Sequence, residues 1–230
     1  MREIIFDTET TGLDSREDRI IEIGGIELDN HFPTGRTLHI YINPGDRKVH
    51  PDALAVHGIT EEFLKDKPPF ADVAEQILNF FEGAKWIAHN ATFDMGFVNA
   101  ELARLGFPPI QPSEVIDTLS LARRKHPMGP NSLDALCRRY GIDNSHRAKH
   151  GALLDSELLA EVYIEMIGGR QAALGLAGPG QMTVEESEAA DALIAGRPEP
   201  LAERVTEVER QAHDAMVAKI GGKALWSRYQ

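Results

Sequence analysis

The chain has 230 residues, 42% of them hydrophobic, which is enough for one domain of ordinary size with an appendage and excludes disorder throughout. Its net charge of −12 excludes a protein that grips nucleic acid through a broad basic surface. The charge does not exclude an enzyme that binds only a short single-stranded end of nucleic acid, through metal ions and a narrow pocket. The single cysteine, Cys137, excludes an intrachain disulfide and a zinc site built from cysteines.

The first residues, MREIIFDTE, do not have the pattern of a signal peptide. No apolar run approaches the roughly 18 residues of a membrane span. We therefore expect a cytoplasmic protein with no membrane partner. Cys137 lies in an apolar helical stripe, which predicts a buried core thiol rather than a nucleophile.

The hydrophobic pattern predicts a sheet covered by helices that ends near residue 168. Three strands close together along the chain favour an antiparallel meander, and from about residue 51 the apolar period becomes helical. The predicted elements are strands over 3–8, 19–28 and 36–42, a helix from about 70, a strand over 85–89, a helix over 93–105, a strand and helix over 114–125, a helix that stops at Gly141 and a helix over 151–169.

The composition changes beyond this domain. Residues 174–200 are rich in glycine, proline, alanine and acids, which is typical of a flexible linker. An amphipathic segment follows, with apolar residues near one face: Leu201, Val205, Val208, Ala212, Met216 and Ile220. Because this segment lies outside the main domain, its apolar face must pack against some other surface. We divide the chain into 1–170, 171–200 and 201–230.

Two carboxylates follow the first apolar run, in the stretch FDTETTG. Asp7 and Glu9 stand two positions apart, so in a strand their side chains point to the same face. Two adjacent carboxylates at the end of a buried strand repel each other and lose hydration unless a cation or a proton neutralises them. The alternative is a solvated strand end at which Thr10, Thr11 and Gly12 simply make a turn.

Other polar residues also have two readings. Asp94, in HNATFDMGF, is either a functional carboxylate or an acid favoured by a helix dipole. His89 and Asn90 are either site residues or polar residues that end a strand. His146 and His150 have a spacing that zinc could use, but no third ligand follows convincingly. His150 and Asp155 would be about 140° apart on one helix, so they converge only if His150 sits on the loop that enters the helix.

Together these residues resemble the DEDDh exonuclease superfamily. FDTETTG, HNATFDMGF and HGALLD match its three motifs in order, and the last motif, H-x-A-x-x-D, fits His150 and not His146. VHGIT, NSLDALCRRYGIDNS and LAEVY extend the resemblance to proofreading exonucleases of bacterial replicative polymerases, strongly over residues 3–170 and more loosely in the tail. The resemblance implies a ribonuclease H-like α/β fold, a mixed sheet flanked by helices, followed by a flexible linker and a C-terminal helical docking segment.

The resemblance also implies a chemistry. The site would be built from hard oxygen ligands for two Mg²⁺ or Mn²⁺ ions, supplied by Asp7, Glu9, Asp94 and Asp155. The positive charge of the ions would neutralise the repulsion between the paired carboxylates. His150 would take a proton from the attacking water, since histidine exchanges protons near neutral pH. The product would be a nucleoside 5′-monophosphate released from a single-stranded 3′ end of DNA.

Contacts with substrate and partners are further implications. The terminal nucleotide would meet residues near the end of the first strand and two polar residues elsewhere: Thr8, Thr10, Gly12, Leu13, His57 and Asn90. Phe93 could pack near the site or belong to the core. A peptide with Gln171, Leu174 and Leu176 resembles those that bind sliding clamps, and Trp226, Arg228 and Tyr229 would dock on the polymerase alpha subunit. The sequence does not decide whether a small accessory subunit also binds this domain.

Two other functions compete with proofreading. A free-standing DEDDh nuclease acting on RNA or oligonucleotide ends would share the core but have no use for a linker and a docking segment. A non-catalytic subunit that bridges the clamp and the polymerase would not need the metal-binding residues.

Overall fold

The computed structural model describes residues 1–145, 149–168 and 206–220. The chain forms two units, Met1–Gly175 and Leu176–Gln230. The predicted linker lies outside the described residues.

A five-stranded mixed sheet in the order β3-β2-β1-β4-β5 lies at the centre of the first unit. Its strands are β1 (Arg2–Thr10), β2 (Ile20–Asp29), β3 (Phe32–Tyr41), β4 (Lys85–Ala88) and β5 (Val115–Asp117). The first three strands are antiparallel, which confirms the predicted meander, and β4 and β5 run parallel to β1. The third strand begins at Phe32, earlier than predicted, because it pairs with β2 back to the hairpin turn.

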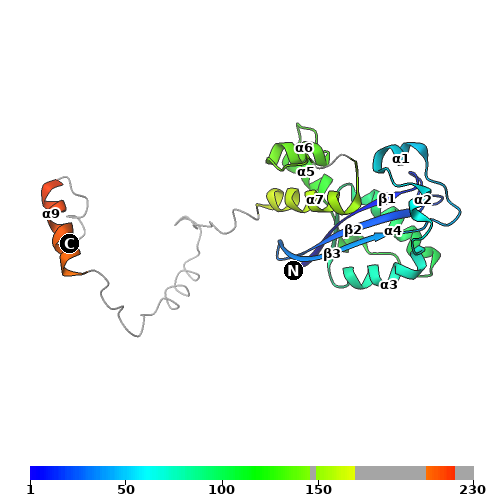
Figure 1. Ribbon diagram of the computed structural model, residues 1–230, viewed down its shortest axis with the longest axis horizontal. Coiled ribbons are helices and arrows are strands. Elements are labelled where there is room, and N and C mark those ends of the chain that lie inside the picture. Colours follow the sequence, from blue (N-terminus) through cyan, green and yellow to red (C-terminus); the bar gives the residue numbers. More distant parts are fainter. Residues whose placement is uncertain (146–148, 169–205, 221–230) are drawn as a thin grey trace. The chain divides into compact units, whose positions relative to one another are not determined.

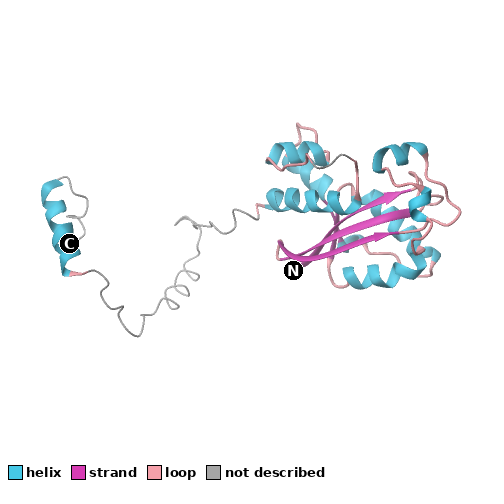
Figure 2. Cartoon of the chain, viewed as in Figure 1, coloured by secondary structure: helices cyan, strands magenta, loops and turns pink. Residues whose placement is uncertain are grey.

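Helices cover both faces of this sheet, as Figures 1 and 2 show. They are α1 (Pro51–His57), α2 (Glu61–Leu64), α3 (Phe70–Phe81), α4 (Ala91–Arg104), η1 (Pro112–Glu114), α5 (Thr118–Lys125), α6 (Leu133–Tyr140) and α7 (Ala152–Ile167). Alternation along β1 separates two cores: Ile4 and Phe6 pack with α3 and α4, whereas Ile5 packs with α6 and α7. The predicted α/β fold is thus confirmed, and Cys137 is fully buried in the second core.

Two short helices, α1 and α2, occupy the stretch for which the sequence indicated only a change of period. Pro51 suits the first position of α1, and the helix ends at Gly58, whose φ of 72° requires a residue that tolerates the left-handed region. Thr60 caps α2 by accepting the N–H of Phe63. These caps fix where α1 stops and hence where His57 points.

A buried ion pair ties the start of β2 to α4. Arg19 donates to both carboxylate oxygens of Glu101, from Nε at 2.6 Å and from Nη2 at 2.8 Å, and the side chain of Glu101 is 1% exposed. Removing one partner of a buried pair costs about 3–5 kcal/mol, and the partial exposure of Arg19 lowers that figure. The pair fixes α4 against the sheet, and α4 carries Asp94.

The described part of the second unit is the helix α9 (Glu207–Ile220). It starts with a reciprocal cap, in which Thr206 Oγ1 accepts the N–H of Glu209 while a Glu209 carboxylate oxygen accepts the N–H of Thr206. The apolar side chains of Val208, Met216 and Ile220 are exposed. Within the described ranges, no helix has the length and apolar character needed to cross a membrane.

Candidate active site

The end of β1 carries two acidic residues of the site. Asp7 and Glu9 border the same cavity, as strand alternation predicts for positions two apart. The hydroxyl of Thr8, between them, donates to Asp94 Oδ1 at 2.7 Å. Glu9 is 8% exposed, so its carboxylate is largely removed from water. These contacts bring the first and second sequence motifs together.

Asp94 lies in the first turn of α4, the helix that follows β4. Burial raises the pKa of this carboxyl to about 7, and the Thr8 hydrogen bond opposes that rise. At neutral pH such a group is easily protonated unless a cation is near. A perturbed carboxyl at the mouth of a cavity is the type of residue that functional sites contain.

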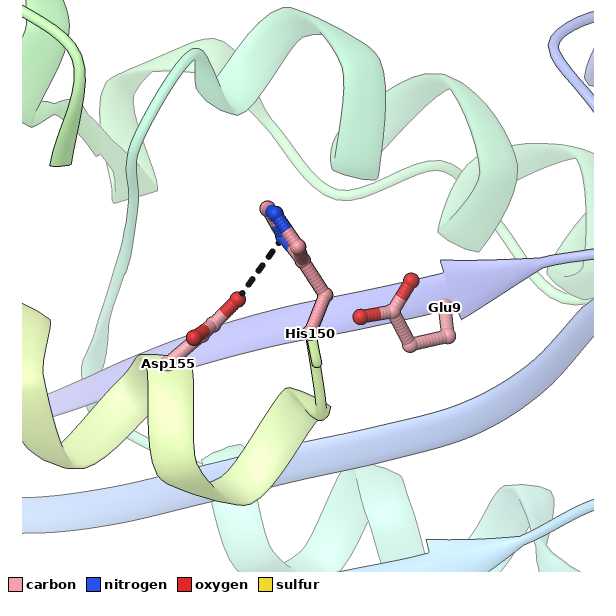
Figure 3. A group of neighbouring side chains, drawn as sticks. All are labelled: Glu9, His150 and Asp155. Carbon is pink, nitrogen blue, oxygen red and sulfur yellow. Dashed lines mark ion pairs between the residues drawn. The ribbon is translucent and has the colours of Figure 1, made fainter. Parts of the chain in front are cut away.

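His150 and Asp155 meet at the N-terminus of α7, as Figure 3 shows. The helix begins at Ala152, so His150 sits on the entering loop while Asp155 points inward from the first turn. His150 Nδ1 lies 3.2 Å from Asp155 Oδ2, and the backbone N–H of His150 donates to the carbonyl of Val56 in α1. This is the arrangement that the sequence required for the two side chains to converge.

A cavity of about 290 Å³ collects all five motif residues. Besides them it is lined by Thr8, His89, Asn90, Phe93, Ser132, Leu133 and Asp134. One ligand atom each from Glu9, His150 and Asp155 lies within 4.8 Å of the others, close enough to surround a single cation. The donors are mostly carboxylate oxygens, so the residues fit a hard divalent cation.

A larger neighbouring cavity of about 900 Å³ shares Thr8, Glu9 and Phe93 with the first. Its lining includes Thr8, Thr10, Gly12, Leu13 and His57, five of the six predicted substrate contacts. Thr10 Oγ1 donates to the carbonyl of Gly12 at 2.6 Å, and a Cβ at Gly12 would lie 2.4 Å from a carboxylate oxygen of Asp18. Gly12 therefore keeps the loop after β1 close to Asp18, while Leu13 is 85% exposed at the rim.

His57 is buried against this larger cavity with one ring nitrogen unused. Its Nδ1 accepts the N–H of Ile59 at 2.9 Å, so the proton of the neutral ring is on Nε2. Among buried side-chain nitrogens and oxygens of the described residues, His57 Nε2 is the one with no hydrogen-bond partner. Burial lowers the pKa of His57, and the backbone of Thr10 opposes this more weakly. His57 thus interacts with the backbone of Thr10 without a regular hydrogen bond at Nε2, and such a buried donor beside a cavity suits a ligand oxygen.

Asn90 is in the left-handed region, with φ 68° and ψ 47°, at the turn between β4 and α4. Its backbone N–H donates to Asp117 Oδ1 at 3.0 Å, which holds the turn while the side chain borders the smaller cavity. His89 instead contacts Thr118 Oγ1 and the carbonyl of Asn131, and burial lowers its pKa. Asn90 is thus placed at the site, whereas His89 mainly joins neighbouring segments.

Several lining residues were not singled out from the sequence. Ser132 and Asp134 start α6, and the only signal for them was the helix cap in NSLDALC. Arg47, Lys48 and His50 line the larger cavity from the loop before α1. The partner-contact residues Gln171, Leu174, Leu176, Trp226, Arg228 and Tyr229, and also His146, lie outside the described residues.

Comparison with known proteins places this site in a family. The exonuclease (RNase_T) family model matches residues 4–163. DNA polymerase III subunit epsilon of Escherichia coli K12 is 44% identical over 98% of this chain and 97% of its own length. The subunit of the same name from Rickettsia felis is 52% identical over 75% of this chain and 77% of its own length.

Solved structures agree with this placement. Exonuclease X in complex with 5′ overhanging duplex DNA is 29% identical, with a TM-score of 0.55 over 73% of this chain and 91% of its own. The nuclease domain of 3′hExo, a DEDDh family member bound to rAMP, has a TM-score of 0.63 over 73% of this chain and 92% of its own. At 17% identity the second likeness concerns the fold alone.

The chain belongs to the exonuclease family, with the ribonuclease H-like fold of its DEDDh members. Its similarity to the epsilon subunits of DNA polymerase III extends over nearly the whole chain. It is a metal-dependent 3′–5′ exonuclease of the proofreading type.

Asp117 allows a test of how the turn before α4 is held. Burial acts to raise the pKa of Asp117, but hydrogen bonds from Ser120 and three backbone N–H groups outweigh it and lower that pKa. A lowered folded pKa adds stability above the unfolded pKa, and this stability is lost as pH falls through the folded pKa. We expect Asp117→Asn to lower the free energy of unfolding by about 1 kcal/mol at pH 7 and to have little effect near pH 2.

Urea unfolding of the metal-free protein across this pH range measures the difference. Asp72→Asn, at an exposed carboxylate in the first turn of α3, is the control and should change little at either pH. If Asp117→Asn lowers the free energy of unfolding by the same amount at pH 2 as at pH 7, the charge of Asp117 does not hold the turn.

Proposed function

We propose that this chain removes mismatched 3′-terminal nucleotides from DNA during replication, releasing nucleoside 5′-monophosphates by hydrolysis with two Mg²⁺ or Mn²⁺ ions. The observation that carries the proposal is the meeting of Asp7, Glu9, Asp94, His150 and Asp155 around one cavity, from three distant parts of the sequence. The cellular setting would be the cytoplasm, where the chain would act as a subunit of the replicative polymerase.

The carboxylates would hold the metal ions. The residues that would hold the ions are Asp7, Glu9, Asp94 and Asp155, whose carboxylates border one cavity. When bound, the ions supply Lewis-acid stabilisation of the attacking and leaving oxygens of the phosphodiester. The hydrogen bond from Thr8 and the placement of Asp94 at a helix N-terminus keep its carboxylate turned toward the site.

His150 would act as the general base. It takes a proton from the water that attacks phosphorus, and the bond from phosphorus to the 3′ oxygen of the preceding nucleotide breaks. That oxygen takes a proton from solvent as it leaves, which balances the proton held by His150. The contact with Asp155 orients the ring. Because His150 is on a loop, about half of its side chain is exposed, so it can return the proton to solvent.

The larger cavity would hold the terminal nucleotide. Thr8, Thr10 and Gly12 line it along the end of β1, Leu13 stands at its rim, and Phe93 offers an aromatic surface. His57 Nε2 would donate to a sugar or phosphate oxygen, and the Asn90 amide would contact the phosphate from the smaller cavity.

Preference for a mismatch follows from the size of this site. We infer that the cavity of about 900 Å³ would take an unpaired end rather than a duplex, so that the terminal base pair would have to open first. Opening costs a few kcal/mol for a paired base and least for a mismatched one. A mismatched end therefore enters the site more often, with no need for the protein to read the base.

We expect metal-dependent release of nucleoside monophosphates from a primer–template with a mismatched 3′ end, faster than from a paired end. EDTA should abolish release, and Asp7→Ala should abolish it because the proposed metal site loses one of its carboxylates. His150→Ala should lower kcat by about 10²–10⁴-fold, the usual contribution of a general base. Single-turnover assays with Mg²⁺ and with Mn²⁺ measure these effects.

An RNA primer of the same sequence distinguishes the free-standing nuclease from the proofreading enzyme. Equal rates on RNA and on paired and mismatched DNA would favour the former. No release with either metal would favour a bridging subunit, whose role is to join clamp and polymerase.

The segment 201–230 would bind the alpha subunit of DNA polymerase III. The exposed apolar side chains of α9 need a partner surface, and Trp226, Arg228 and Tyr229 are the residue types that dominate interfaces. We expect deletion of 201–230 to abolish co-purification with the alpha subunit while nuclease activity on a free primer stays unchanged. Retained co-purification would contradict this assignment.

The segment from Gln171 to Leu176 would bind a sliding clamp. We expect the double variant Gln171→Ala, Leu174→Ala to weaken clamp binding in surface plasmon resonance without changing nuclease activity. Gln181→Ala is the control, because Gln181 lies in the predicted linker beyond the proposed clamp-binding peptide. Unchanged clamp affinity would rule the site out. A small accessory subunit could cover the domain, and gel filtration of reconstituted mixtures would reveal it.

A further inference from the structure

The strand β2 supplies no motif residue, yet it lies directly beside both carboxylates of β1. In the antiparallel register Asp7 pairs with Gly24 and Glu9 pairs with Glu22. Paired residues on antiparallel strands direct their side chains to the same face. Glu22 and Gly24 are therefore the nearest neighbours, across the strands, of two proposed metal ligands.

Glu22 is a buried acid outside the motif set, with 2% of the residue exposed. Its Oε2 accepts the N–H of Ala152, the first residue of α7, at 3.2 Å. Its Oε1 lies 2.7 Å from His39 Nε2 on β3. Tyr41 is also close: burial raises the pKa of Tyr41 to about 12, and the charge and hydrogen bonding of Glu22 add to that rise.

Gly24 makes a second contact with the same helical turn. A Cβ at this position would lie 2.3 Å from the backbone nitrogen of Leu153 and 2.4 Å from the carbonyl carbon of Ala152. Both atoms belong to the backbone, so α7 would have to move to make room. The hydroxyl of Ser156 also donates to the carbonyl of Gly24, at 3.1 Å.

The first turn of α7 is thus docked on β2 at two neighbouring points, by a hydrogen bond at Glu22 and by close approach at Gly24. Asp155 belongs to that turn, and His150 comes two residues before it starts. The two β2 residues that seat α7 are the same two that pair with Asp7 and Glu9. The distances between the β1 carboxylates and the α7 side chains are therefore determined through β2.

We propose that Glu22 is a positioning residue for the nuclease site, which together with the close approach at Gly24 sets the spacing between the β1 carboxylates and the pair His150 and Asp155. The proposal rests on the proposed function of that site. Glu22 touches neither substrate nor cation in this account; it acts through the N-terminus of α7.

A carboxylate suits this position better than an apolar side chain of similar size. The first N–H groups of a helix have no partner within the helix, and the helix dipole makes them favour a negative acceptor. Without an acceptor at Glu22, the buried N–H of Ala152 would be unsatisfied, and a shift of α7 toward water would relieve the cost. Such a shift would carry Asp155 and His150 away from Glu9.

The test compares Glu22→Leu with Glu22→Gln. Leucine removes the acceptor, whereas glutamine keeps a carbonyl oxygen for the Ala152 N–H at nearly the same size. Glu27→Leu and Glu27→Gln are matched controls, because Glu27 is also a buried acid on β2, is 4% exposed, and is ion-paired with Arg2 and Arg36 away from the site. Thermal unfolding of all four variants reports whether each remains folded.

We expect Glu22→Leu to lower kcat by about 10- to 100-fold with little change in KM for the primer, the size typical of groups that orient metal ligands. Glu22→Gln should recover most of the loss, and both Glu27 variants should keep wild-type kcat even where they lose stability. Calorimetric titration of Mn²⁺ into the proteins gives a readout independent of turnover, and only Glu22→Leu should bind more weakly. Wild-type kcat and Mn²⁺ affinity in folded Glu22→Leu would overturn the proposal, as would equal losses in Glu27→Leu.

Gly24→Ala provides a second test that leaves every hydrogen-bonding group in place. Its control is Gly25→Ala, whose added Cβ would meet only side-chain atoms of the other core, at 3.3 Å or more. We expect Gly24→Ala to lower kcat and Mn²⁺ affinity and Gly25→Ala to change neither. Equal activity of the two variants would contradict the proposal. If wild-type protein released no nucleotide while Asp7→Ala still bound less Mn²⁺, the proposed function would fail instead.

Discussion

The mutual repulsion of carboxylates gathered at one edge of a buried sheet is the constraint on which the site depends. Asp94 and Asp155 are each 3% exposed and Glu9 is 8% exposed, so water does little to screen their charges from one another. The pKa of Asp94 is raised mainly by burial, which penalises the charged form of this carboxyl. These buried carboxylates stay together only if the rest of the fold holds them in place and a bound cation or proton offsets their repulsion.

The fold holds these groups by using the ends of its elements. Glu9 lies near the end of β1, Asp94 follows β4 in the first turn of α4, and Asp155 is in the first turn of α7. Two of the three carboxylates therefore have a helix N-terminus nearby, whose dipole favours negative charge. The arrangement also explains the role of β2. Because α7 comes from a remote part of the chain, its N-terminus needs a surface to pack against, and β2 provides it.

The sequence predicted most of this arrangement, because it depends on local patterns. Strand alternation placed Asp7 and Glu9 on one face, and the limit on His150 and Asp155 correctly required a loop before α7. Residues whose importance comes from contacts across the fold could not be predicted in this way. Glu22 reads as one acid in an ordinary strand until its register with Glu9 is known, and His57 gains meaning only when α1 places its free nitrogen at a cavity. Of the tail, the structure describes α9, whereas the named contact residues such as Gln171 and Trp226 lie outside the described ranges.

The net charge of the chain and its proposed attachment to a polymerase explain each other. A cleft of carboxylates in a protein of charge −12 repels the backbone of DNA, so the free enzyme should bind a primer end weakly. Tethering replaces that missing affinity with effective concentration, which for a flexible connection of moderate length reaches the millimolar range. Weak intrinsic binding then becomes useful, because a paired end is released before the terminal base pair opens and only an end that frays readily stays long enough to be cut.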